Sequence, residues 1–208
     1  MIGPPGAGKG TQGALIAEHF DIPRIVMGDL LRDHVARHTN LGRVVDGYLG
    51  RGELVPDDVM LCIVRQALIA ARAAGGYVFD GVPRTMAQAR AAYTIAAELG
   101  MTANAAVHLR ADDKELMRRL RGRAALEHRT DDTEAVIRHR LELYQKAAQP
   151  IIAWYAQRGI LVSVDAMRQA REVGREILAA LELLPEPIGP ASVRHHPVDL
   201  SGLGAGCA

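Results

Sequence analysis

A glycine-rich stretch near the start of the chain has the residue types and the spacing that hold phosphate. It reads Gly-Pro-Pro-Gly-Ala-Gly-Lys-Gly-Thr over residues 3–11, so a glycine, four further residues and a Gly-Lys pair follow one another. Glycine tolerates the backbone angles that turn successive N–H groups toward an anion and lets that anion come close. Lys9 can reach the terminal phosphates of a nucleotide, and the helix expected to begin there points its positive end at the same place. The stretch therefore predicts a phosphate-binding loop, whereas a glycine-rich turn without a ligand would leave the lysine spacing unexplained.

A second candidate group follows the apolar run at residues 77–80, which is typical of a buried parallel strand that ends in an acid. Asp80 beside a phosphate loop could hold Mg²⁺ through water, because Mg²⁺ keeps much of its hydration shell. Arg84, in the loop after this strand, could grip a phosphate through two parallel hydrogen bonds. Together, Asp80 and Arg84 favour a site for a phosphate and a metal ion over two unrelated surface charges.

Arginines in the second half of the chain form a third group. Arg119 and Arg123 share a helical face, whereas Arg138 and Arg140 do not, so only one of that second pair can face a site. Phosphoryl transfer requires positive charge around the transferring oxygens, and arginine supplies it. The alternative is a solvated basic helix or a nucleic-acid patch, which the interspersed acids and the lack of aromatic residues for base stacking disfavour.

Alternating strands and helices must position these side chains. Apolar runs predict strands at 77–80, 105–109 and 161–165, with a short extended run at 24–27. Helical periodicity is expected at 9–20, 40–53, 131–157 and 169–183, with a kink or break near Pro150; further helices are expected to begin at 28, 57 and 113, and another to run to about Leu99. This order predicts an α/β protein with a parallel sheet flanked by helices, in which ligands bind at the carboxyl ends of the strands.

The beginning of the chain departs from this plan. A phosphate loop normally follows a buried strand, yet only Met1 and Ile2 precede Gly3. We therefore expect the first strand to be truncated, and we favour a natural start that lies upstream. Without that strand the 208-residue chain is expected to be unstable or weakly active, so a nucleotide-binding protein with little turnover is an alternative to an enzyme.

Composition limits the remaining possibilities. The net charge of +1 gives no overall field that would favour nucleic acid or a membrane, and neither is expected as a partner. Cys62 and Cys207 are the only cysteines and no cluster of metal ligands surrounds them, so no zinc is expected and a reducing cytoplasm is the default location. Prolines and glycines concentrate in residues 185–208, which predicts a disordered tail after a folded domain at 1–184.

Several of these motifs resemble those of the adenylate kinase family. The loop G-P-P-G-A-G-K-G-T, the segment G-D-L-L-R ending at Arg32, the segment D-G-V-P-R ending at Arg84, and Gln88 beyond it stand in the family's order. The stretch R-T-D-D at 129–132 with V-I-R-H-R-L at 136–141 continues the likeness. The resemblance implies a P-loop nucleoside monophosphate kinase fold, a mobile monophosphate-binding subdomain at 26–55, and a short lid loop at 122–132 that carries no zinc.

The resemblance also implies an activity and a set of site residues. The activity is the reversible, Mg²⁺-dependent reaction of ATP with AMP to give two ADP, carried out by a monomer. The residues implied to bind ATP are Gly6, Ala7, Gly8, Lys9, Gly10, Thr11, Arg119, Arg123 and Arg168. Those implied to bind AMP are Met27, Arg32, Glu53, Leu54, Val55, Gly81, Val82, Pro83, Arg84, Gln88, Arg129 and Arg140. Catalytic roles are implied for Lys9, Arg84, Arg123, Arg129 and Arg140, and Asp80 would hold Mg²⁺ through water.

Two positions depart from the family's pattern. Met27 stands where the family has a threonine beside the adenine, and Val82 replaces the usual aromatic residue. A thioether cannot donate a hydrogen bond as a hydroxyl does, so the preferred base is left open. A kinase that phosphorylates UMP or CMP is therefore the closest alternative within the same enzyme class.

Overall fold

The structure, a computed structural model, describes residues 1–127 and 133–184. Its helices are α1 Lys9–Phe20, α2 Met27–Ala36, α3 Asn40–Arg51, α4 Asp57–Ala71, α5 Met86–Glu98, α6 Asp113–Glu127, α7 Glu134–Gln157 and α8 Ala170–Glu182. A short 3₁₀ turn covers Arg72–Ala74, and the strands are β1 Arg24–Val26, β2 Val78–Asp80, β3 Ala106–Arg110 and β4 Leu161–Asp165. The tail at 185–208 and the segment 128–132 lie outside the described residues.

The strands pair in parallel, as the alternation of strands and helices predicts. Strand β1 pairs with β2 so that Val26 lies opposite Asp80, and β3 pairs with β4 over five residues. Parallel pairing places the carboxyl ends of these strands, and the loops that follow them, on one edge of each ladder.

Met1 and Ile2 join the two strand pairs. The backbone N–H of Ile2 donates to Val107 at 2.7 Å, and its carbonyl accepts from the Leu109 N–H at 2.9 Å. On the other side, the Met1 amine donates to the carbonyl of Phe79 at 2.7 Å. The expected reduction of the first strand is thus confirmed for the described chain: a single bridge at Ile2 stands between β2 and β3, directly before the phosphate loop.

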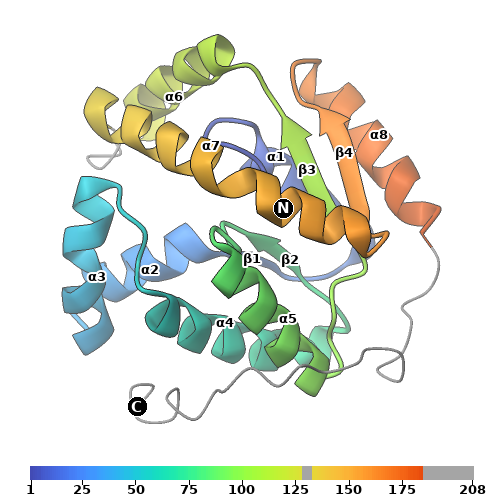
Figure 1. Ribbon diagram of the computed structural model, residues 1–208, viewed down its shortest axis with the longest axis horizontal. Coiled ribbons are helices and arrows are strands. Elements are labelled where there is room, and N and C mark those ends of the chain that lie inside the picture. The colour runs from blue at the N-terminus through green and yellow to red at the C-terminus, as the bar shows by residue number, and fades with distance from the viewer. Residues whose placement is uncertain (128–132, 185–208) are drawn as a thin grey trace.

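Helices cover both sides of the strands. Helix α1 packs against β1, β2 and α8, and α8 packs against β4, so these two helices form one layer. Helix α7 packs against β4, α5 and α6 and crosses in front of the strands in Figure 1, which makes it part of the opposite layer. Helices α2 and α3 pack against each other, at the end of the molecule away from α8 (Figure 1).

Two helices differ from the sequence expectation. Helix α7 runs through Pro150, so of the two expected outcomes the break is wrong, although a proline removes one helical hydrogen bond. Residues 122–127, expected in the lid loop, instead continue α6, because alanine, leucine and glutamate at 124–127 are strong helix formers. No helix within the described ranges combines the length and the hydropathy needed to cross a bilayer.

Burial of Tyr155 on α7 leads to a testable dependence of stability on pH. Its side chain lies in an apolar cluster with Trp154, and burial raises the pKa of Tyr155 to about 12. In the unfolded chain a tyrosine ionises near pH 10, so the stabilising contribution is complete below about pH 10 and is lost as pH rises from there toward 12. We expect the urea midpoint to fall across this range, and to fall less steeply in Y155F. An equal fall in Y155F would assign the effect to other groups.

Candidate functional site

A single cleft of about 840 Å³ gathers residues from many separate parts of the described chain. The loop before α1, the start of α2, the segment after α3, the end of β2 and the turn after β4 all contribute to it. Its volume falls in the range of sites for small molecules and cofactors. The cleft lies where parallel-sheet proteins bind ligands, at the carboxyl ends of the strands.

The glycine-rich loop closes one side of this cleft. Gly6 and Gly8 have φ of +83° and +91°, and a Cβ on Gly6 would lie 2.9 Å from Cγ of Leu120. Gly8 then caps α1, so the first N–H groups of that helix face the cleft region. Lys9 Nζ donates to the carbonyls of Gly3 at 2.8 Å and Pro4 at 2.9 Å, which holds its charge across the mouth of the loop.

Three guanidinium groups from different elements approach one another in the cleft. Arg32 comes from α2 and is paired with Asp29, whereas Arg140 comes from α7 and donates to the Leu49 carbonyl at 3.3 Å. Arg84 Nε donates to the carbonyl of Gly81 at 2.9 Å. Of the two candidates on α7, Arg138 is exposed and paired with Glu134, so Arg140 is the one in the cleft.

Burial and the neighbouring charges change the pKa of Arg84. Although solvent reaches Arg84 through the open cleft, its guanidinium lies deep within the outline of the protein, and this desolvation is the main reason that the pKa of Arg84 is lowered. Repulsion by Arg140 and by Arg32 lowers that pKa further, against the attraction of Asp80. Positive groups that repel one another around a cleft are stabilised by an anion, so the arrangement is suited to phosphate.

Asp80 lies at the end of β2 with only 8% of its surface exposed. Its Oδ2 accepts from Arg24 on β1 at 3.2 Å. The guanidinium of Arg24 lies over α1, since a Cβ on Gly10 would come within 3.1 Å of its Nη2 and one on Gly13 within 3.3 Å of its Nε. The sequence did not point to Arg24, although a charged residue inside a short strand is a signal that could have found it.

The residues around Asp80 are compatible with one hydrated Mg²⁺ ion. No group of three or more histidine, cysteine, aspartate or glutamate side chains lies together within residues 1–127 and 133–184. Mg²⁺ on a nucleotide needs only one or two carboxylates, because phosphates and water supply the other ligands. Asp80 lines the cleft beside the phosphate loop and meets this need as a single, water-mediated partner.

A different wall of the cleft contains Met27 and Gln88, each about 1% exposed. The Gln88 amide bonds to two protein groups, Asp57 and the backbone N–H of Arg84, both at 2.8 Å. Val82 points away from the cleft into the core that α2, α4 and α5 share, and Pro83 follows it through a cis peptide bond.

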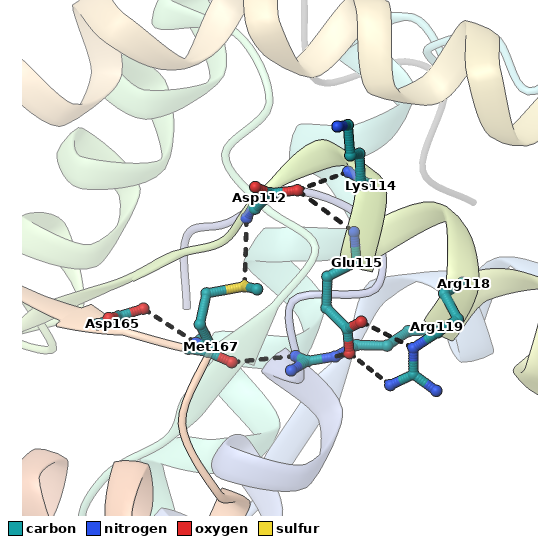
Figure 2. A network of polar contacts seen from close by, with 8 residues as sticks. Asp112, Lys114, Glu115, Arg118, Arg119, Asp165 and Met167 are labelled. Carbon is teal, nitrogen blue, oxygen red and sulfur yellow. Dashed lines mark hydrogen bonds and ion pairs between the residues drawn. The ribbon is translucent and has the colours of Figure 1, made fainter.

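The opposite end of the cleft is tied together by a network between α6 and the turn after β4. Arg119 donates to Glu115 at 2.8 Å and to the carbonyl of Ala166 at 3.1 Å, and its contact with Glu115 can be followed in Figure 2. Hydrogen bonds from Arg118 and Arg119 hold the pKa of Glu115 down at about 2, so this carboxylate stays ionised. The sulfur of Met167 accepts from the N–H of Asp112 (Figure 2), which joins the same turn to the start of α6.

Most of the predicted site residues meet in this cleft. Those that line it are Gly6, Ala7, Gly8, Lys9, Gly10, Thr11, Met27, Arg32, Glu53, Leu54, Val55, Asp80, Gly81, Arg84, Gln88, Arg119, Arg140 and Arg168. Val82 and Pro83 do not line it, and Pro83 borders a smaller neighbouring pocket instead. Arg129 and the side chain of Arg123 lie outside the described residues. Lining residues that the sequence did not indicate include Arg24, Gln12 and Val173.

Comparison with known proteins agrees with this arrangement. The family model described as "Adenylate kinase" matches residues 1–160. An adenylate kinase of Kocuria rhizophila is 44% identical over 182 residues, which cover 88% of this chain and 97% of that protein. An adenylate kinase of Thermus thermophilus is 43% identical over 87% of this chain and 95% of that protein. One of Thermobifida fusca is 39% identical over 88% of this chain and 96% of that protein. The chain belongs to the adenylate kinase family.

Proposed function

We propose that this protein transfers a phosphoryl group reversibly from ATP to AMP, with Mg²⁺, to give two ADP. The observation that carries the proposal is the meeting of Lys9, Arg32, Arg84 and Arg140 in one cleft beside a glycine loop. These four cations come from four separate elements and line one cleft of about 840 Å³. The similarity to adenylate kinases along most of the chain supports the same reaction.

In the proposed mechanism the protein supplies position and charge. The nucleophile is an oxygen of the AMP phosphate, which is already ionised at neutral pH, so no side chain has to remove a proton. Arg32, Arg84 and Arg140 would hold that phosphate in line with the terminal phosphate of ATP, which the loop amides and Lys9 would bind. Charge that develops on the transferred group would then be stabilised by groups fixed before the reaction begins. Asp80 would hold Mg²⁺ through water, and the ion would supply further positive charge near the phosphates.

Closure around the two nucleotides completes the proposal. Residues 26–55, which include α2 and α3, would move as a monophosphate-binding subdomain, and the segment around 122–132 would act as a short lid. Arg140 already reaches across from α7 to the carbonyl of Leu49 on α3, so one of the proposed phosphate ligands also touches the mobile part. Closure would exclude water, which protects the phosphoryl group from hydrolysis. We further infer that the protein works as a monomer, as the resemblance implies, and in the cytoplasm, as its low cysteine content favours.

A panel of acceptors tests the proposed substrate. The protein is mixed with ATP, Mg²⁺ and one of AMP, CMP, UMP, GMP or IMP, and ADP formation is measured. We expect AMP to give a much higher kcat/KM than UMP, GMP or IMP, because the wall beside Met27 holds the Gln88 amide in the orientation that an acceptor nitrogen beside an amino group requires. A higher rate with UMP or CMP would change the acceptor, and binding without turnover would favour a nucleotide-binding protein.

A further inference from the structure

Two protein groups fix the direction in which the amide of Gln88 points. Its Nε2 donates to Oδ1 of Asp57 at 2.8 Å, and its Oε1 accepts from the backbone N–H of Arg84 at 2.8 Å. A carboxylate can only accept a hydrogen bond and a backbone N–H can only donate one. The oxygen and the nitrogen of this amide therefore have a single arrangement that satisfies both neighbours.

Asp57 is itself held in place. It is the first residue of α4, and both of its carboxylate oxygens lie within reach of the Thr85 hydroxyl, at 3.4 and 3.2 Å. Thr85 in turn caps α5 by accepting from the N–H of Gln88 at 3.0 Å. The start of α4 and the start of α5 are thus linked through one compact set of hydrogen bonds behind the cleft wall.

A reversed amide would face two repulsive contacts in this setting. Its oxygen would meet the carboxylate of Asp57, and its NH₂ group would meet the N–H of Arg84. Gln88 is only 1% exposed, so water could not satisfy the groups that lose their partners. A glutamine that is free to turn can read either of two opposite hydrogen-bond patterns, whereas this one can read only the pattern that its fixed orientation matches.

The hydrogen-bonding capacity left on Gln88 defines that pattern. One N–H of Nε2 and one lone pair of Oε1 are not used by Asp57 or Arg84. A base that matches them presents an acceptor nitrogen beside an amino group, as adenine does. Hypoxanthine, guanine and uracil present an N–H beside a carbonyl and would need the reversed amide.

We propose that Asp57 is a positioning residue that locks the Gln88 amide and thereby selects an amino-substituted base on the acceptor monophosphate over a keto base. Asp57 acts only through Gln88. The proposal rests on the proposed function and names the structural cause of its preference for AMP over monophosphates that carry a keto base. It accounts for selectivity at a site where Met27 cannot donate a hydrogen bond.

AMP and IMP provide the sharpest test, because they differ mainly at this edge of the base. Dissociation constants for both are measured by calorimetry on the full chain, together with KM and kcat. D57A removes the carboxylate that accepts from Gln88 Nε2, and Q88L removes the Gln88 amide itself. D58A is the matched control, since Asp58 is the exposed neighbour in the same first turn of α4 and its loss changes the helix charge equally.

We expect D57A to reduce the preference for AMP over IMP by about tenfold or more, the scale of one paired base contact. The preference for AMP over IMP should be at least as low in Q88L as in D57A, and in D58A it should equal that of the wild type. ATP affinity should be the same in the wild type and all three variants. The change should appear in KM more than in kcat. If D57A is not folded by circular dichroism, D57L replaces it, because leucine is of similar size and cannot accept a hydrogen bond.

Each other outcome has a distinct meaning. If D57A or D57L keeps the wild-type preference for AMP over IMP while Q88L loses it, Asp57 does not position the amide, although Gln88 still recognises the base. A wild-type ratio in Q88L would overturn both roles. Failure of the wild-type protein to bind AMP would overturn the proposed function and the lock together, which separates that failure from a lock that is merely misassigned.

Discussion

Replacing Arg84 with alanine is expected to lower kcat for ADP formation by about 10³-fold while leaving the empty protein as stable as before. Activity should fall because alanine lacks the two parallel N–H donors with which the Arg84 guanidinium can bind a phosphate. Arg84 lies close to Arg32 and Arg140 in the cleft. Stability should hold because the Arg84 side chain is exposed to solvent, and repulsion by Arg140 and Arg32 offsets its attraction to Asp80 in the empty site. A coupled assay measures the first effect and thermal melting the second.

Two further variants make the result for Arg84 specific. R84K keeps the charge without the fork and should fall between the wild type and R84A, because an ammonium group cannot bind phosphate through two parallel bonds. R90A alters an exposed arginine on α5 and should behave as the wild type. Turnover in R84A within tenfold of the wild-type rate would remove Arg84 from the reacting centre.

Replacing Lys9 with methionine is expected to reduce kcat by a similar factor of about 10³, because the proposed contact with the terminal phosphate of ATP is lost. The ammonium group lies against the carbonyls of Gly3 and Pro4, beside the proposed position of the ATP phosphates. Methionine has nearly the same length, so the loss is one of charge and hydrogen bonding rather than of volume. Stopped-time assays of ADP formation measure kcat, and calorimetry with ATP measures the accompanying loss of affinity.

The matched control for Lys9 is K146M, which neutralises an exposed lysine on α7. It should leave both kcat and ATP affinity unchanged. If K9M weakened AMP binding but not ATP binding, the two nucleotides would occupy the cleft in the opposite order from the one proposed.

The sequence determined the elements and the order of the motifs, because both depend on local chemistry. The bounds expected for α1 and β4 match the structure at every residue, since glycine, proline and apolar periodicity act over a few neighbouring positions. The phosphate loop was equally visible, because its chemistry lies in nine consecutive residues. Helical spacing also predicted that only one of Arg138 and Arg140 could reach the site, and the resemblance to the family selected Arg140.

Only the tertiary structure decided which distant side chains meet. Arg24 pairs with Asp80 because β1 lies beside β2 in a register that sets Val26 opposite Asp80, and nothing near Arg24 in the sequence specifies that register. Asp57 reaches Gln88 only because α4 and α5 pack together at their first turns. Side-chain direction across such contacts depends on packing between whole elements, which periodicity within one element does not encode. The sequence alone thus predicted a phosphate site, while the packing of helices and strands determined which side chains, among them Asp57 and Gln88, meet beside it.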